Sequence, residues 1–345
     1  MSDSIFEEGG PHKIKRIGQD RYELNVSLPT DDDGMTGREC PSSICEPAYF
    51  KVKPGTGIKN QEFAYCPYCS QKEAPDHFHT AEQNNYVQQI VQREALVGIN
   101  KMMFDTLELD QRGERTIDGG LVSFKISVES SDPPPVPRPW EEELRRNLIC
   151  PHCSLEHAVF GLAIWCPDCG KNIFLTHVEG EFNVIRKMIN DIDSRKERLG
   201  ARIAIKDTEN ALEDVVSTFE AVLRVITKLH LRKSGKTEQE TDQIVSTQVG
   251  NKFQNIEIGA TIFQDLTTIP LLKSLTDDEI DFLKLTFEKR HPITHNLGII
   301  DRKYLQKVRS GELKGREVRV RPSEILTSIE LCLKSINNVY QNLLD

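Results

Sequence analysis

The stretch Cys150-Pro151-His152-Cys153, followed after twelve residues by Cys166-Pro167-Asp168-Cys169-Gly170, decides the fold of the chain around it. A C-P-x-C pair is typical of a tight turn that presents two thiolates to one metal ion. Two such pairs at this separation predict a compact zinc ribbon with four sulfur ligands. Because four thiolates complete a tetrahedral site, we expect this zinc ion to be structural.

A second group of cysteines lies nearer the N-terminus. Cys40 and Cys45 form a looser C-x4-C pair, and Cys66-Pro67-Tyr68-Cys69 follows. These four residues predict a second zinc ribbon, with His77 and His79 as alternative ligands if Cys40 or Cys45 does not bind. The two ribbons together require two structural zinc ions. They either stabilise small modules that lack a large core, or they bind nucleic acid or a partner protein.

The amino-acid composition limits the classes of protein to which the chain can belong. The chain has 345 residues, 38% hydrophobic and 28% charged, which is typical of a globular protein with two or three domains. It contains no apolar run of the ~18 residues that a membrane helix needs. Its first residues are polar, so we expect no secretory signal and a cytoplasmic location. The net charge of −9 argues against nonspecific coating of nucleic acid.

A proline-rich stretch divides the chain. The sequence predicts an N-terminal zinc-ribbon domain over residues 1–129, with a helix over 80–110 and a strand over 121–128. A stiff linker follows over 130–140, then the second ribbon over 141–180. Helical periodicity begins at 181 and continues to 345. The predicted fold class is therefore two small β-rich zinc-ribbon modules followed by an all-α bundle.

Within the helical region, three helices have clear signals. Residues 201–232 carry an apolar stripe at helical spacing, and a last helix begins at Pro322. The segment Thr276-Asp277-Asp278-Glu279 is a capping box that begins another helix. Pro292 cannot continue that helix, so we expect a break that lets the side chains of Arg290 and His295 converge.

The residues at this break are Lys289-Arg290-His291-Pro292-Ile293-Thr294-His295-Asn296. An arginine can hold a phosphate in a bidentate manner, and a histidine can move a proton near neutral pH. These two groups suffice to cut RNA through its own 2′-hydroxyl without a metal ion. Residues 289–321 contain ten Lys or Arg and only three acids. We therefore predict RNA contacts at Lys289, Arg302 and Lys303.

On these residues, the region 181–345 resembles a HEPN domain, an all-helical family whose ribonuclease members carry an arginine, four to six residues, then a histidine. Here the motif spans Arg290 to His295, with the polar His291 after the arginine. The segment 207–220 also resembles the long early helix of the family. Pro292 inside the motif is a departure from the family pattern.

The resemblance implies a HEPN-type RNA endonuclease that works as a homodimer. His295 would be the general base, Arg290 would hold the scissile phosphate, His291 would assist as an acid, and Asn296 would orient a phosphate or His295. Such enzymes serve as toxins or in defence against phage, with an antitoxin or regulatory partner. Two alternatives remain open: a zinc-ribbon protein that binds nucleic acid or protein without cutting, and a scaffold whose helical domain only dimerises.

Overall fold

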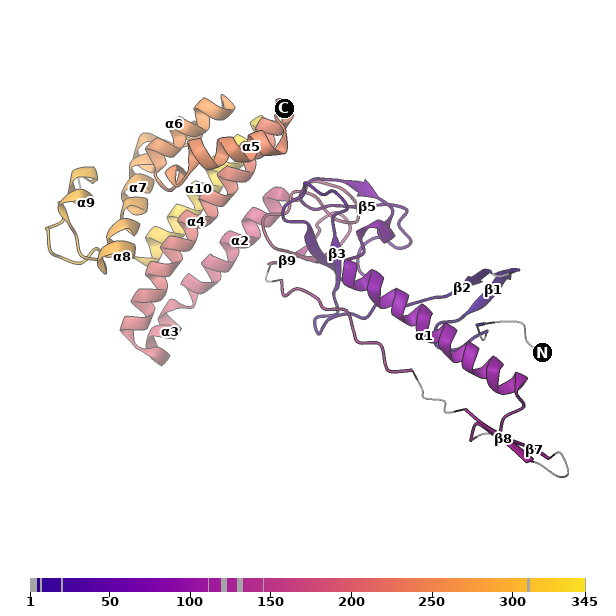
Figure 1. Cartoon of the computed structure of the whole chain (residues 1–345). Helices are drawn as coiled ribbons and strands as arrows, with labels where there is room; N and C mark the ends of the chain where they lie inside the picture. The colour runs from indigo at the N-terminus through magenta and orange to yellow at the C-terminus, as the bar shows by residue number, and fades with distance from the viewer. Residues whose placement is uncertain are drawn as a thin grey trace. The chain divides into compact units, whose positions relative to one another are not determined.

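The computed structural model describes residues 5–6, 8–19, 21–110, 112–118, 123–128, 133–144, 146–308 and 311–344 (Figure 1). The chain divides into two compact units. The first comprises residues 1–160 and 167–170, and the second comprises residues 161–166 and 171–345. The first is β-rich and the second is helical, so the coarse order expected from the sequence is confirmed.

The first unit is built on a four-stranded antiparallel sheet. Its strand order is β3 (Thr36–Glu39), β4 (Tyr49–Val52), β10 (Glu156–Val159), β9 (Arg146–Ile149). Among the described residues, three two-stranded sheets complete the strands: β1 (Lys15–Gly18) with β2 (Arg21–Glu23), β5 (Ala64–Tyr65) with β6 (Lys72–Glu73), and β7 (Glu114–Asp118) with β8 (Ser123–Ser127). The predicted strand over 121–128 corresponds to β8, while Leu121 and Val122 lie outside the described residues.

The central pairing of this sheet joins distant parts of the chain. Phe50 on β4 faces Val159 on β10, and Val52 faces His157. Residues before and after the proline-rich stretch therefore form one sheet, which differs from the two separate modules expected from the sequence. Residues 133–140 form neither helix nor strand, and residues 130–132 lie outside the described chain. The stretch is a connection within one unit.

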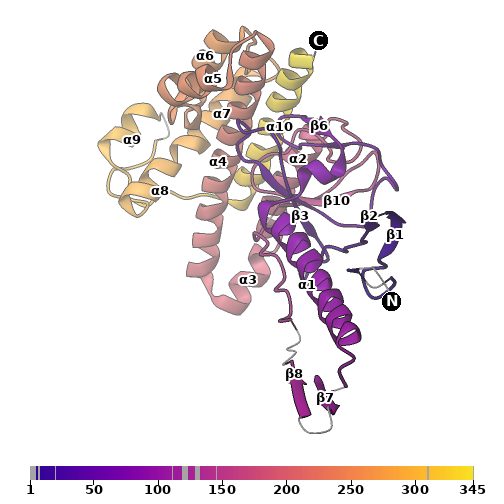
Figure 2. The ribbon, with the colours of Figure 1, turned by 45° about the vertical axis from the view of Figure 1, so that its right-hand side comes forward.

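Helix α1 and its N-terminal cap hold the proline-rich connection in place. Helix α1 (Ala81–Thr106) follows the short helix η1 (Pro75–Phe78). It begins at a capping box in which Thr80 and Gln83 exchange hydrogen bonds. The buried amide of Gln83 also donates to the Gly37 carbonyl and to Glu141. Glu141 accepts a second bond, of 2.7 Å, from the Tyr49 hydroxyl. Figure 2 shows the β7–β8 hairpin that follows α1 in the chain.

The second unit is a helical bundle. Its long helices α2 (Phe174–Asn190), α4 (Ala201–Lys233) and α10 (Pro322–Leu344) pack against one another. The shorter elements are α3 (Ile192–Leu199), α5 (Glu238–Ile244), the π-helical turn η2 (Val245–Val249), η3 (Lys252–Gln254), α6 (Ile256–Thr267), α7 (Asp277–Glu288), α8 (Arg290–Asn296) and α9 (Arg302–Lys307). The helices expected over 201–232 and from Pro322 are thus present.

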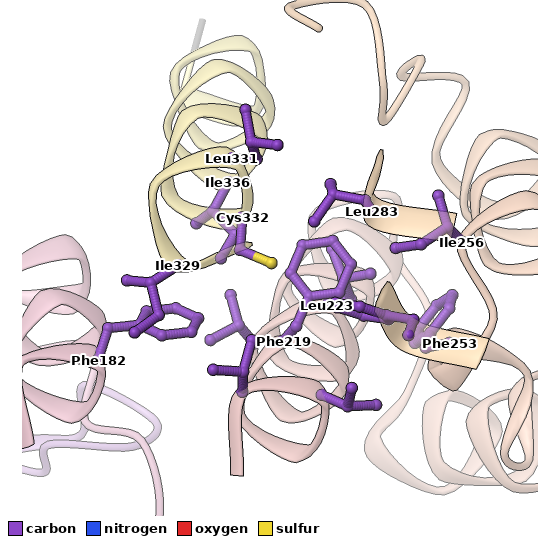
Figure 3. Close-up of a cluster of buried hydrophobic side chains, with 14 of the residues drawn as sticks. Phe182, Phe219, Leu223, Phe253, Ile256, Leu283, Ile329, Leu331, Cys332 and Ile336 are labelled. Atoms are coloured by element: carbon purple, nitrogen blue, oxygen red, sulfur yellow. The ribbon is translucent and has the colours of Figure 1, made fainter. Parts of the chain in front are cut away.

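The apolar stripes of α2, α4, α7 and α10 form one core. Phe219 on α4 meets Phe287 on α7 edge to face at 5.8 Å between ring centroids. Figure 3 shows the sulfur of Cys332 pointing into this cluster, where complete burial raises the pKa of its thiol. This ninth cysteine is therefore a core residue. None of the described helices is long and apolar enough to cross a membrane.

Candidate functional site

The first cysteine cluster brings together Cys40, Cys45, Cys66 and Cys69. Cys40 directly follows β3, and the Cys66–Cys69 turn joins β5 to β6. The sulfurs of Cys40 and Cys69 are 3.6 Å apart, as are those of Cys45 and Cys66. All four sulfurs lie within 4.8 Å of one another. The looser C-x4-C pair therefore folds onto the C-P-x-C pair as the sequence predicted.

The second cluster contains Cys150, Cys153, Cys166 and Cys169, again with all sulfurs within 4.8 Å of one another. The Cys150 and Cys169 sulfurs are 3.7 Å apart. Cys150 follows β9, so the sheet that pairs β9 with β10 fixes the position of this turn.

Three of the four cysteine pairs share one backbone geometry. The N–H of the first cysteine donates to the carbonyl five residues later, at 2.9 Å in each case. The fourth residue after that cysteine has a left-handed backbone. The turns begin at Cys66, Cys150 and Cys166, and their left-handed residues are Ser70 (φ 62°), Ser154 (φ 63°) and Gly170 (φ 63°). At Gly170 a side chain would also collide with the ring of Tyr65, so glycine is required there.

The sulfur separations fit a tetrahedral metal ion. Zinc bonded to four sulfurs at about 2.3 Å places neighbouring sulfurs about 3.8 Å apart. A disulfide would need about 2.05 Å instead. The observed 3.6 and 3.7 Å match the metal geometry, so each cluster can hold one ion and is compatible with zinc. The spare candidates His77 and His79 belong to neither cluster, and His77 lies 3.5 Å from Glu73.

In the helical unit, the capping box predicted at Thr276 and Glu279 begins α7. The break at its end differs from the prediction. The helix breaks at Lys289, before the proline, and α8 resumes at Arg290, so that Pro292 lies in its first turn. The physical reason is that Pro292 has no N–H for the Glu288 carbonyl and its ring crowds that carbonyl. Arg290 and His295 therefore occupy one short helix.

On α8 the side chains of Arg290 and His295 do not converge. Five residues at ~100° each place them ~140° apart around the helix. Arg290 is half-buried and donates from Nη2 to the amide oxygen of Gln254 on η3. On the same face, Thr294 donates to Glu213 on α4 at 2.9 Å. The guanidinium is thus directed toward the bundle.

Gln254 extends this contact into a partly buried hydrogen-bond network. Its amide nitrogen donates to Glu220 at 2.7 Å, and Glu220 on α4 accepts from Arg224. Arg224 also donates to the Gly250 carbonyl. Sequence reasoning did not find this network, because the residues are spread over three elements and carry no local motif.

The pair that the structure does bring together is His291 and His295. They lie one helical turn apart, with ring centroids 5.0 Å apart and ring planes at 54°. His295 is exposed and His291 is half-buried. Burial is the largest cause that lowers the pKa of His291, and the positive charge of Lys303 is the next largest. The negative charge of Asp301 raises this pKa.

The position of Lys289 in the structure differs from the one expected of an RNA contact. Its side chain is only 7% exposed, and its ammonium donates to Glu324 at 2.6 Å and to the Arg319 carbonyl at 2.9 Å. These bonds tie the end of α7 to the start of α10. We therefore exclude Lys289 from the predicted RNA contacts.

A basic rim adjoins the histidine pair. We give this name to the exposed residues Arg302, Lys303, Lys314, Arg316, Arg319 and Arg321. Backbone bonds hold the rim against the end of α8: Ile300 donates to the Arg316 carbonyl, and Val318 donates to the Gly298 carbonyl, both at 2.8 Å. Arg309, counted in the basic run, lies outside the described residues.

Asn296 forms a hydrogen bond at the C-terminal end of α8. Its side-chain nitrogen donates to the Ile299 carbonyl at 2.7 Å, across the left-handed Leu297. The N-cap of the next helix, α9, is Asp301, whose carboxylate accepts from the Tyr304 N–H. This cap fixes Arg302 and Lys303 in the first turn of α9, where both side chains are exposed.

No protein-family model matches the chain, and no curated protein or solved structure matches it. The function proposed for this site therefore depends on its own geometry and on the motif at Arg290–His295.

Proposed function

We propose that the helical unit is a metal-independent RNA endonuclease of the HEPN type. The observation that carries the proposal is the His291–His295 pair on α8, with ring centroids 5.0 Å apart, beside an exposed basic rim. Cutting RNA through its 2′-hydroxyl needs a base near neutral pH and cations that hold the phosphates. Imidazoles and a lysine- and arginine-rich surface meet both needs.

In this proposal His295 is the general base, since its exposed ring can reach a bound RNA. It removes the 2′-hydroxyl proton, the 2′-oxygen attacks phosphorus, and the 5′-oxygen leaves. The products are a 2′,3′-cyclic phosphate and a 5′-hydroxyl. The lowered pKa of His291 argues against the acid role expected for it from the sequence. In this proposal the His291 ring instead positions the His295 ring. A water molecule protonates the leaving 5′-oxygen.

In the proposal, Arg290 holds a phosphate at the His295 of a second copy of the chain. Its side chain lies ~140° from His295 around α8, so one phosphate does not meet both groups of the same chain. The homodimer implied by the HEPN resemblance would bring Arg290 of one copy to His295 of the other, and the Arg290 guanidinium would then exchange its bond to Gln254 for the phosphate. Light scattering of the full chain tests this: a monomer at micromolar concentration that still cuts RNA would contradict the shared site.

We further propose that each cysteine cluster binds one structural zinc ion. Cysteine thiolates in tetrahedral geometry favour zinc, and no cluster leaves a position for a substrate. When bound, each zinc ion would crosslink the turns that carry its four cysteines. The zinc ions take no part in the reaction at His295.

The experiment is a cleavage assay on pooled cellular RNA in EDTA, with wild type and His295→Ala compared at equal concentration. Loss of a general base lowers the rate on the order of 10²–10⁴ and leaves RNA affinity nearly unchanged, because proton transfer acts in the transition state. Equal rates for the two proteins would refute the proposal. RNA binding by both without cleavage by either would favour the alternative of a non-catalytic binding protein.

A toxin or phage-defence role follows if the protein cuts cellular RNA. Expression of wild type in bacterial cells is expected to arrest growth, and expression of His295→Ala to an equal level is not. Equal growth of the two cultures would contradict this role, even if RNA is cut in vitro.

A further inference from the structure

The two histidines of α8 have the arrangement of a chelating pair. They are spaced H-x3-H, which places both rings on one face of the helix. Their centroids are 5.0 Å apart. His295 is exposed, so an ion in solution has access to the pair.

The separation of the rings matches what a bound ion requires. A metal–nitrogen bond of about 2.0–2.1 Å places each ring centroid about 3.2 Å from the ion, so two imidazoles on a tetrahedral ion have centroids about 5 Å apart. The observed 5.0 Å between the two ring centroids matches this separation.

The surrounding charges permit an ion here and limit its affinity. Asp301 adds a negative charge that acts on His291, and Lys303 and Lys307 add positive charges. The Lys307 ammonium is paired with Glu288 at 2.8 Å, which offsets much of its effect. Two imidazole nitrogens beside a single carboxylate predict weaker binding than at the four-thiolate clusters. Imidazole ligands also favour zinc, nickel and copper over magnesium or calcium.

We propose that His291 and His295 bind one divalent transition-metal ion, additional to the ions of the two cysteine clusters. If the proposed function is correct, this ion inhibits RNA cleavage, because it occupies the lone pair with which His295 would accept the proton. The binding itself does not depend on the proposed function. The site would make the activity sensitive to free zinc, nickel or copper.

The test uses untagged full-length protein with both cysteine clusters loaded with zinc. Titration calorimetry with Ni²⁺ is expected to show one further equivalent. His291→Gln and His295→Gln should each weaken that binding on the order of tenfold or more, because a chelate is reduced to a single ligand. The matched control is His77→Gln, which removes an exposed histidine next to Glu73 and should leave the affinity unchanged.

Absence of the further equivalent, or equal affinity of wild type and His291→Gln, would overturn the proposed metal site. A cleavage assay without EDTA forms a separate arm, in which Ni²⁺ should inhibit at the concentration that saturates the calorimetric site. Calorimetric binding by a protein that cuts no RNA would refute the proposed function and leave the metal site supported. Cleavage that persists at saturating Ni²⁺ would overturn the inhibitory role.

Discussion

Lys289 offers a sharp test, because its expected and observed roles predict opposite results. Sequence reasoning makes it an RNA contact, whereas the structure pairs it with Glu324 and the Arg319 carbonyl. We consider Lys289→Met, which keeps most of the side-chain volume and removes the charge. If Lys289 joins α7 to α10, the substitution destabilises the fold and leaves the RNA affinity of the folded protein unchanged.

The magnitude follows from what the substitution leaves behind. Removing one partner of a buried ion pair costs about 3–5 kcal/mol, since the other charge stays buried. Glu324 is 18% exposed and still accepts the Arg321 N–H at 2.7 Å, so part of its solvation is retained. We therefore expect a loss of about 2–3 kcal/mol in the free energy of unfolding.

The assay is urea unfolding of the full chain followed by helical circular dichroism. The matched control is Lys334→Met, which breaks an ion pair with Glu279 in which the lysine side chain is 46% exposed. Such surface pairs contribute about 0–1 kcal/mol. If Lys289→Met costs no more than Lys334→Met, the buried pair does not stabilise the fold as described. A drop in RNA affinity without a loss of stability would restore the expected role.

Three further predictions concern other parts of the chain. Metal analysis of purified protein is expected to give about two zinc equivalents, and Cys40→Ser should remove one of them; an unchanged zinc content would exclude the first cluster. Phe219→Ala should cost about 3–5 kcal/mol in urea unfolding, since this ring is fully enclosed; a cost below about 1 kcal/mol would contradict the described core. Lys303→Ala should weaken RNA binding and reduce its salt dependence by about one phosphate contact, whereas Lys273→Ala, exposed on another part of the surface, should do neither.

The cysteine clusters were predictable because their chemistry is local. A C-P-x-C turn fixes its own backbone, and spacing alone pairs the thiolates. The pairing of β4 with β10 was not predictable, since the strands are short and are separated by about a hundred residues. The proline-rich stretch between them is typical of a domain linker, whereas the pairing of β4 with β10 and the bonds of Glu141 show that the chain returns to the same unit.

At α8 the sequence identified the right segment with the wrong geometry. The capping box at Thr276 and the proline at 292 correctly predicted a helix and a break. The break lies at Lys289 because a proline disturbs the carbonyl four residues before it. That shift of three residues leaves His291 facing His295 and turns Arg290 toward Gln254. The burial of Lys289 depends on Glu324, a partner that no local pattern reveals.

The most direct test of the proposed chemistry is a substrate lacking the nucleophile. After a cleavage site has been mapped in an RNA oligonucleotide, the 2′-hydroxyl at that site alone is replaced by hydrogen. Attack by the 2′-oxygen predicts that cleavage at this position stops, that the oligonucleotide still binds, and that the unmodified RNA yields a 2′,3′-cyclic phosphate. Cleavage of the 2′-deoxy position at the original rate would contradict the mechanism centred on His295.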